Sequence, residues 1–307
     1  MLSIPKPFNR LNDVYFKYLL ASPERKDLTI NFLNAVLNHL KIEDEAPILI
    51  EDIEFLDRET ILEIQQAKGS RFDVFARSVD GRIFHIEVQN MKEKFFLKRS
   101  FFYAVSDYMM QAKRGVKYDN LEPVIFIGLM NFNMDNLSSP DEWYTLHRVS
   151  NVITHKPTFR EVEFHMIELP KFRHYLKKSG MKPEDDLEEL LCYFGNVGGK
   201  KFMEEIAERN EMIARYQELE RLFDRDPIEI RNFLINERMK VDYQYNLEDA
   251  REEGLEEGRK LGLEQGIEQG LAQAQMETAR NLRLQGILSD EQIAQVLNIP
   301  VDLVAKL

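Results

Sequence analysis

The sequence of 307 residues has a single cysteine, Cys192, and no long hydrophobic run. One thiol excludes an intramolecular disulfide and is typical of a reducing compartment, where a buried thiol is the ordinary state. No segment approaches the roughly 18 apolar residues of a membrane helix, and the first residues lack the apolar stretch of a signal peptide. We therefore expect a cytoplasmic protein with no membrane partner.

Basic residues are in the minority, with 41 Lys and Arg against 53 Asp and Glu and a net charge of −12. This balance argues against a surface that binds nucleic acid over its whole area. Residues 92–117 are locally basic, and this strip is either a solvated helix face or a surface for a phosphodiester substrate. Its cations are Lys92, Lys94, Lys98, Arg99, Lys113, Arg114 and Lys117.

The order of hydrophobic patterns predicts an α/β core within residues 1–170. Asn12 or Asp13 is expected to start the first helix. Helical periodicity covers 11–22, 24–40 and 95–113, and strand patterns cover 49–57, 72–90 (a hairpin), 123–132, 143–150 and 161–169. In the helix over 95–113 the pattern predicts an apolar face through Phe95, Phe102, Val105 and Met109.

The hairpin has one register that keeps its apolar residues together. A three-residue loop, Val79 to Gly81 with a left-handed glycine, pairs Ser78 with Arg82. Val74 then faces Ile86 and Ala76 faces Phe84, and Asp73 falls opposite Glu87. We expect one face of this hairpin to pack and the other to carry chemistry.

Asp73 and Glu87 would have Cβ atoms roughly 4.5–5.5 Å apart, so the carboxylates repel unless a cation lies between them. Gln89 points the same way. The alternative is a solvated acid pair, or ion pairs with Arg71 and Arg77. His85 lies on the same face, but a lone histidine is more often a packing or hydrogen-bonding residue than a metal ligand.

The chain beyond residue 170 is expected to be almost entirely helical. We predict a helical region over 171–242, a charged helix over 243–285 and a small helical unit over 286–307, in which Ser289 and Gln292 form a capping box. Five glycines recur every fourth residue in the charged helix, a spacing that suits close packing against a second helix. The alternative is a partly frayed linker. The glycines are Gly254, Gly258, Gly262, Gly266 and Gly270.

An Asp on one strand followed by Glu-X-Gln on the next resembles the PD-(D/E)XK nuclease signature. The flanking stretches "NDVYFKYLLASPERKDLTINFLNAVL", "RFDVFAR", "HIEVQN" and "KRSFFYAVSDYMMQ" resemble the Rpn family of recombination-promoting nucleases, also called PD-(D/E)XK family transposases. The resemblance implies a restriction-endonuclease-like core with a helical C-terminal extension. It also implies a DNA endonuclease that uses Mg²⁺, with Mn²⁺ as a substitute.

The resemblance assigns expected roles to individual residues. Asp73, Glu87 and Gln89 would be catalytic, and the metal would be held by Asp73, Glu87 and the backbone carbonyl of Val88. Lysine is the commonest residue of the wider signature at position 89, so Lys98 or Arg99 would supply the missing charge. Asp13 matches an additional acid on the first helix, and Glu24 is a weaker candidate. DNA would contact Lys92, Lys94, Lys98 and Arg99.

Two functions follow from these patterns. The first is a Mg²⁺-dependent DNA endonuclease of a recombination system or mobile element, assembled as a homodimer or larger oligomer by its C-terminal helices. The second is a catalytically silent relative in which the same fold serves as a binding or assembly module. A C-terminal DNA reader is a third interpretation, and Lys306 as the one cation of its last helix argues against it.

Overall fold

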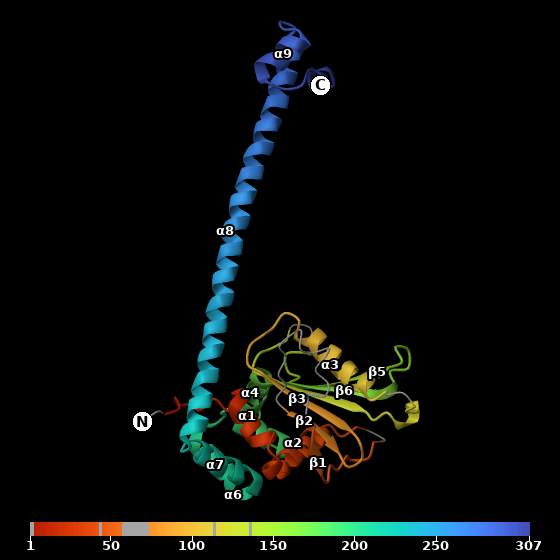
Figure 1. The fold of residues 1–307 in the computed structure, drawn as a ribbon, viewed down its shortest axis with the longest axis vertical. Helices are drawn as coiled ribbons and strands as arrows, with labels where there is room; N and C mark the ends of the chain where they lie inside the picture. The colour runs from red at the N-terminus through yellow and green to blue at the C-terminus, as the bar shows by residue number, and fades with distance from the viewer. Residues whose placement is uncertain (1–2, 43–44, 57–73, 113–114, 135–136) are drawn as a thin grey trace. The chain divides into compact units, whose positions relative to one another are not determined.

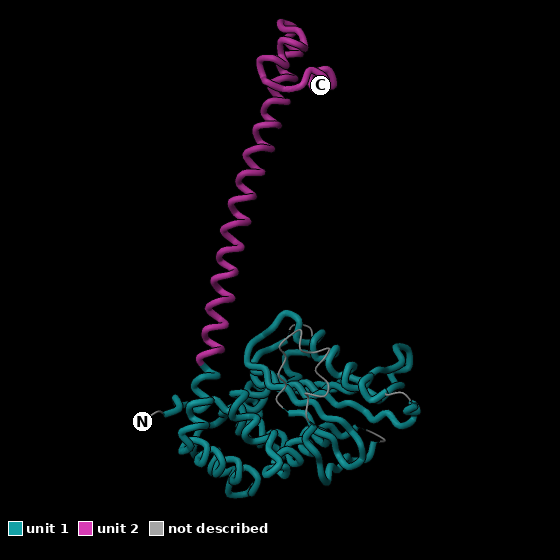
Figure 2. The backbone as a smooth tube through the Cα atoms, in the orientation of Figure 1, with its two compact units in different colours: residues 1–237 teal, residues 238–307 magenta. Residues whose placement is uncertain are grey.

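The computed structural model describes residues 3–42, 45–56, 74–112, 115–134 and 137–307. Clustering of contacts divides the chain into two compact units, residues 1–237 and 238–307 (Figure 2). The finer domain boundaries predicted above stay predictions. Among the described residues, no helix is both long and apolar enough to cross a membrane.

A six-stranded mixed sheet organises the first unit, in the order β1-β2-β3-β4-β6-β5. Strands β3 and β4 are parallel, as are β4 and β6, and the other neighbours are antiparallel. All seven residues of β4 are buried, as expected for a strand that is covered on both faces. The strands are β1 (Ile53–Phe55), β2 (Val74–Ser78), β3 (Ile83–Gln89), β4 (Val124–Met130), β5 (Tyr144–Ser150) and β6 (Pro157–Glu168).

Helices cover both faces of this sheet, with α3 on one side and α1 and α2 on the other (Figure 1). Two short 3₁₀ helices, η1 (Pro23–Arg25) and η3 (Tyr118–Asn120), lie between the longer elements. The α-helices of the first unit are α1 (Asp13–Leu20), α2 (Lys26–His39), α3 (Phe96–Met110), α4 (Leu169–Lys178), α5 (Asp186–Phe194), α6 (Gly199–Arg209) and α7 (Glu211–Phe223).

The predicted hairpin register is confirmed wherever both strands are described. Val74 pairs with Ile86 and Ala76 with Phe84. Ser78 N–H donates to the carbonyl of Arg82 at 2.9 Å, and Gly81 has φ +95°, the left-handed conformation that the three-residue loop requires. Side chains at 84, 86 and 88 therefore point to one face of β3, and those at 85, 87 and 89 to the other.

The expectation that one hairpin face packs while the other is left to chemistry is wrong, because helix α3 covers the second face. Phe75 is 7% exposed and His85 is fully buried. His85 Nδ1 lies 3.0 Å from Asp107 Oδ2 on α3, so His85 has the hydrogen-bonding role. The polar side chains of this face are partly core residues, paired across the sheet and helix.

The predicted apolar face of α3 is also wrong. Phe95, Phe102 and Met109 are 59%, 52% and 67% exposed. The buried face instead carries Phe96, Ser100, Tyr103, Ala104 and Asp107. Two polar residues satisfied inside the protein, Ser100 on the Phe96 carbonyl and Asp107 on His85, replace the apolar residues that the periodicity favoured.

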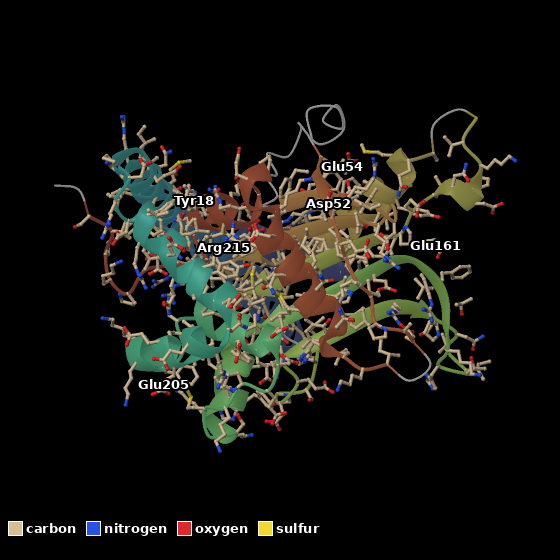
Figure 3. The ribbon with its side chains drawn as sticks, turned by 90° about the horizontal axis from the view of Figure 1, so that it is seen from below. Tyr18, Asp52, Glu54, Glu161, Glu205 and Arg215 are labelled. Atoms are coloured by element: carbon tan, nitrogen blue, oxygen red, sulfur yellow. The ribbon has the colours of Figure 1, made fainter. Side chains whose placement is uncertain are left out.

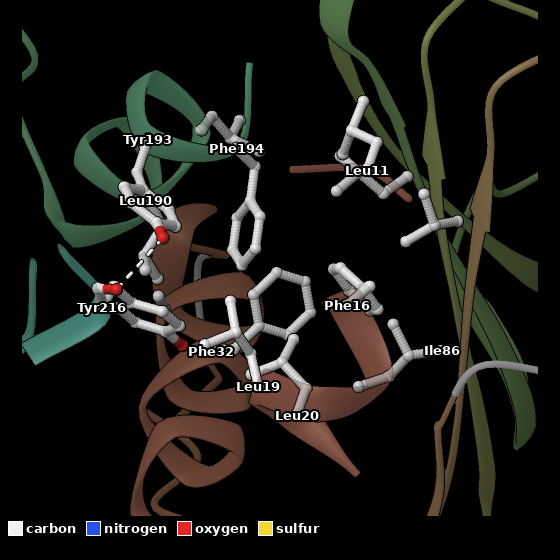
Figure 4. Close-up of a cluster of buried hydrophobic side chains, with 14 of the residues drawn as sticks. Leu11, Phe16, Leu19, Leu20, Phe32, Ile86, Leu190, Tyr193, Phe194 and Tyr216 are labelled. Carbon is white, nitrogen blue, oxygen red and sulfur yellow. Dashed lines mark hydrogen bonds between the residues drawn. The ribbon is translucent and has the colours of Figure 1, made fainter. Parts of the chain in front are cut away.

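A larger core lies between the other sheet face and the helices. Phe16, Phe32 and Phe194 pack with edge-on or tilted rings, close to Ile86 of β3 (Figure 4). Tyr193 donates a hydrogen bond to the carbonyl of Tyr216 at 3.1 Å. Helices beyond residue 170 thus share a core with the sheet. Cys192 lies in it, and burial raises the pKa of its thiol to about 12.

The second unit contains the greater part of α8 (Pro227–Gln285), followed by α9 (Asp290–Leu297) and α10 (Val301–Ala305). The predicted capping box is present, with Ser289 and Gln292 each accepting the other's backbone N–H. A small apolar cluster joins α8 to the two short helices, which agrees with a packing role for them. It contains Ala279, Ile293, Ala294 and Val304.

Candidate functional site

The end of strand β3 carries three predicted site residues, Glu87, Val88 and Gln89. Glu87 is 6% exposed and Gln89 is partly buried, and both point to the face covered by α3. Glu87 pairs with Gly128 on the parallel strand β4. A Cβ atom at Gly128 would lie 3.0 Å from Met166 Sδ and 3.2 Å from the Phe126 ring, so the glycine avoids crowding against these two side chains on the face that carries Glu87.

A cation on α3 meets this carboxylate. Arg99 Nη2 donates to Glu87 Oε1 at 2.6 Å, with the Glu87 side chain 8% and the Arg99 side chain 27% exposed. Burial works to lower the pKa of Arg99, but the charges of Glu87 and Glu93 outweigh it and raise the pKa above its usual value. The guanidinium therefore stays charged beside Glu87.

Glu93 connects the remaining groups and was missed by the sequence prediction. Its Oε1 accepts from Gln89 Nε2 at 2.6 Å, and its Oε2 accepts from Arg99 Nη1. Arg99 therefore contacts two carboxylates at once, and Gln89 is oriented by the second of them. The signal was weak, because an acid four residues after Gln89 in a basic stretch resembles an ordinary solvated residue.

Asp73, the other predicted acid, lies outside the described residues, as do Arg71, Lys113 and Arg114. The confirmed register begins at Val74, the next residue. The opposition of Asp73 to Glu87 stays a prediction.

Helix α1 begins beside the end of β3. Asn90 Nδ2 donates to the carbonyl of Leu11 at 2.6 Å, and Asn12 caps the helix by accepting from the N–H groups of Val14 and Tyr15. Asp13, the first helical residue, is partly buried at this end. The structure therefore brings the start of α1 to the strand end that carries Gln89.

Glu24 and Val88 are placed differently from Asp13. Glu24 lies in η1, beyond the opposite end of α1, where it accepts from the Ser22 hydroxyl. It is therefore not brought to the end of β3. The side chain of Val88 packs into the larger core, so the metal-binding role predicted for Val88 rests on its backbone carbonyl alone.

The predicted DNA-binding lysines lie at the start of α3 and just before it. Lys92, Lys94 and Lys98 are all exposed, and Lys94 Nζ lies 5.3 Å from the centre of the Phe95 ring. Arg99 differs from them, because its guanidinium turns inward to Glu87. This part of α3 thus presents cations and exposed aromatic rings next to a buried carboxylate.

A second carboxylate–guanidinium pair lies at strand β1, at one edge of the sheet. Glu54 Oε1 is 3.2 Å from Arg77 Nη1, and their side chains are 62% and 43% exposed. Glu54 is labelled in Figure 3. Exposed pairs of this kind contribute about 0–1 kcal/mol. Glu54 and Arg77 are therefore a matched comparison for the buried pair of Glu87 and Arg99.

Glu87 and Glu93 are the described carboxylates at the place where the signature implies a metal ion. Within the described ranges, no three His, Cys, Asp or Glu side chains are grouped as metal ligands. Glu87 and Glu93 nevertheless converge on one guanidinium, and carboxylate oxygens are the ligands that Mg²⁺ prefers. These two carboxylates have the chemistry that a hard divalent cation requires, and the guanidinium of Arg99 is paired with both of them.

Searches of curated proteins and of solved structures gave no significant match. A family model described as "PD-(D/E)XK nuclease family transposase" matches residues 10–250, which include the sheet, its covering helices and the first part of α8. This span is more than half of the chain, and the chain therefore belongs to the PD-(D/E)XK nuclease family transposases.

Proposed function

We propose that this protein is a Mg²⁺-dependent endonuclease that hydrolyses phosphodiester bonds of DNA in recombination or in a mobile element. The observation that carries the proposal is the network at the end of β3, where hydrogen bonds join buried Glu87 to Arg99, Arg99 to Glu93 and Glu93 to Gln89. Such a network beside exposed lysines suits a polyanionic substrate.

Each residue has a role in this reaction. Asp73, Glu87 and the carbonyl of Val88 hold the divalent cation, which when bound polarises the scissile phosphate and lowers the pKa of a coordinated water. Gln89, held by Glu93, orients the attacking water. Arg99 and Lys98 stabilise negative charge that develops on the phosphate. Lys92 and Lys94 contact the DNA backbone, and Asp13 is an additional acid at the start of α1.

A plasmid-nicking assay with Mg²⁺ or Mn²⁺ tests the proposal. Wild type is expected to convert supercoiled DNA to nicked or linear forms, and Asp73→Ala is expected to lose this activity. Chelation by EDTA should stop the reaction of wild type. Cleavage that survives in Asp73→Ala would assign the activity to another site or to a contaminant.

Gln89 is expected to act through hydrogen bonding rather than charge. Gln89→Lys should keep or raise cleavage, whereas Gln89→Leu should lower it about tenfold or more, because the donor to Glu93 is lost while the shape is nearly kept. Initial nicking rates at saturating metal measure the effect. Equal rates for the Leu variant and wild type would remove Gln89 from the chemistry.

A catalytically silent module is the second candidate, and one observation favours it. Arg99 already neutralises Glu87, so the carboxylate has a counter-charge without a metal. A metal must compete with this guanidinium or displace it. A protein that binds DNA without Mg²⁺ and never cleaves it would fit this candidate.

We also propose that the second unit associates with another copy of the chain. The five glycines of α8 have open space around their Cα atoms, so the isolated helix gains nothing from them. Four apolar residues, each one position after a glycine, are exposed. They are Leu255 (64%), Leu263 (64%), Ile267 (55%) and Leu271 (61%).

The full-length protein is therefore expected to have at least a dimer mass by light scattering, and a chain that ends at Lys240 is expected to be a monomer. Gly262→Leu should shift the mass that light scattering gives for the full-length protein from the oligomer toward the monomer. Leucine is a better helix former than glycine, and a Cβ atom built at position 262 has no described atom within 4 Å beyond the helix's own neighbouring backbone, so an intermolecular contact explains such a loss. A monomer mass for each of the three proteins would rule out the proposed interface.

A further inference from the structure

The first half of α3 and the residue before it present aromatic rings to solvent. Phe95, Phe101 and Phe102 are 59%, 57% and 52% exposed. A single exposed apolar residue needs no explanation, but three large rings on one helix face mark an interaction site. Lys98, which is also exposed, lies three or four residues from each ring, so its side chain neighbours all three on the helix surface.

The charges of this face have one sign. Residues 94–106 contain three cations and no Asp or Glu, in a chain that has 53 acids. Arg99 turns inward to Glu87, which leaves Lys94 and Lys98 as the cations of the exposed face. Such a face attracts a polyanion, and the carboxylate network at the end of β3 lies at the same end of α3.

A second copy of the chain is a poorer occupant of this face than a polyanion. In a dimer with two-fold symmetry the same residues meet across the axis. Lys98 of one copy would then lie near Lys98 of the other, and residues 94–106 offer no acid to pair with either. Like charges placed together in an interface weaken it.

The exposed rings also distinguish between forms of DNA. The bases of a duplex stack on one another, so a protein ring meets their edges, whereas an unpaired base offers a flat face on which a ring can stack. The ring of Phe101 is held in place for such a contact by Phe164 of β6, with the ring centroids 5.9 Å apart and the planes at 20°. A ring that is already ordered and still exposed loses little freedom when a base stacks on it.

We propose that this face of α3 binds DNA with unpaired bases, so that the substrate of the site at the end of β3 is single-stranded DNA or DNA with a single-stranded segment. Bases stack on Phe95, Phe101 and Phe102, and the phosphates between them contact Lys94 and Lys98. The inference rests on the proposed function in taking DNA as the polyanion, and it adds the form of DNA that the site accepts.

Fluorescence anisotropy of the full-length protein in EDTA measures binding without cleavage. The probes are a labelled strand of about 20 nucleotides and the same strand annealed to its complement. Wild type is expected to bind the single strand at least tenfold more tightly. Phe102→Leu should weaken single-strand binding about fivefold or more and leave duplex binding unchanged, because the ring is lost while an apolar side chain is kept. Phe102→Tyr keeps a ring and should keep most of the affinity.

Phe159→Leu is the matched control, since Phe159 is 56% exposed but belongs to β6, and it should change neither affinity. Equal affinities for the two probes, no binding of either, or an equal loss for both in Phe102→Leu would overturn the inference. A lower light-scattering mass of Phe102→Leu would do so too, by assigning the face to a second copy. Plasmid nicking in Mg²⁺ tests the proposed function separately: a single-strand preference without any cleavage would contradict that function and leave this inference standing.

Discussion

Glu87→Gln is expected to lower metal-dependent DNA cleavage by about three orders of magnitude, since in the proposed function it removes a carboxylate that holds the metal and so the charge stabilisation that the metal supplies. The same variant should lose the rise in melting temperature that Mg²⁺ gives wild type, because a ligand stabilises only the state that binds it. Nicking rates and thermal melts with Mg²⁺ and with EDTA measure the two effects.

Glu54→Gln is the control for this variant. It removes a carboxylate from an ion pair on the same sheet, but at an exposed edge. Both cleavage and the Mg²⁺-dependent shift should stay close to wild type. A Glu87→Gln protein that still melts higher in Mg²⁺ would place the metal elsewhere, and one that still cleaves would remove Glu87 from the chemistry.

Arg99→Met is expected to destabilise the protein by about 2–3 kcal/mol in EDTA, since it takes this guanidinium away from a nearly buried carboxylate. The estimate lies below the range for fully buried pairs because the Arg99 side chain is 27% exposed. For a unit of this size, the melting temperature should fall by roughly 4–12 °C. Mg²⁺ should restore part of the loss, because a divalent cation can neutralise Glu87 in place of the guanidinium.

Arg77→Met is the matched comparison and should cost no more than about 1 kcal/mol, with no recovery in Mg²⁺. The size of the recovery separates the two proposed functions. A larger Mg²⁺-dependent shift in Arg99→Met than in wild type means that Arg99 and the metal compete for one place. No shift in either protein supports the catalytically silent module.

The hairpin could be predicted from the sequence because two local rules agree on it. Side chains alternate with a period of two, and Gly81 allows the left-handed loop, so only one register keeps the apolar residues together. The capping box at Ser289 depends on residues three apart and was equally accessible. Features of this kind are decided within a few residues of the chain.

The buried face of α3 and the role of Glu93 could not be predicted from residues that are close together in the sequence. Asp107 is buried because His85, twenty-two residues away, satisfies it, and Glu93 joins Gln89 to Arg99 only after α3 packs on the sheet. Helical periodicity counts Ser100 and Asp107 as solvent-facing residues and Phe102 as a core residue. In the folded protein Ser100 and Asp107 are buried because each has a hydrogen-bond partner, and Phe102 is exposed.

The connection from β3 to β4 determines the order in which parts of the site can form while the chain is being synthesised. Strands β2 and β3 are neighbours in sequence and can pair as soon as they leave the exit tunnel, with Glu87 already on its strand. Arg99 and Glu93 belong to the crossover that leads to β4, and α3 has a surface to cover only after β4 has added to the sheet. We therefore expect a nascent chain to carry Glu87 on its paired strand before Arg99 and Glu93 can form the hydrogen-bonded network around it.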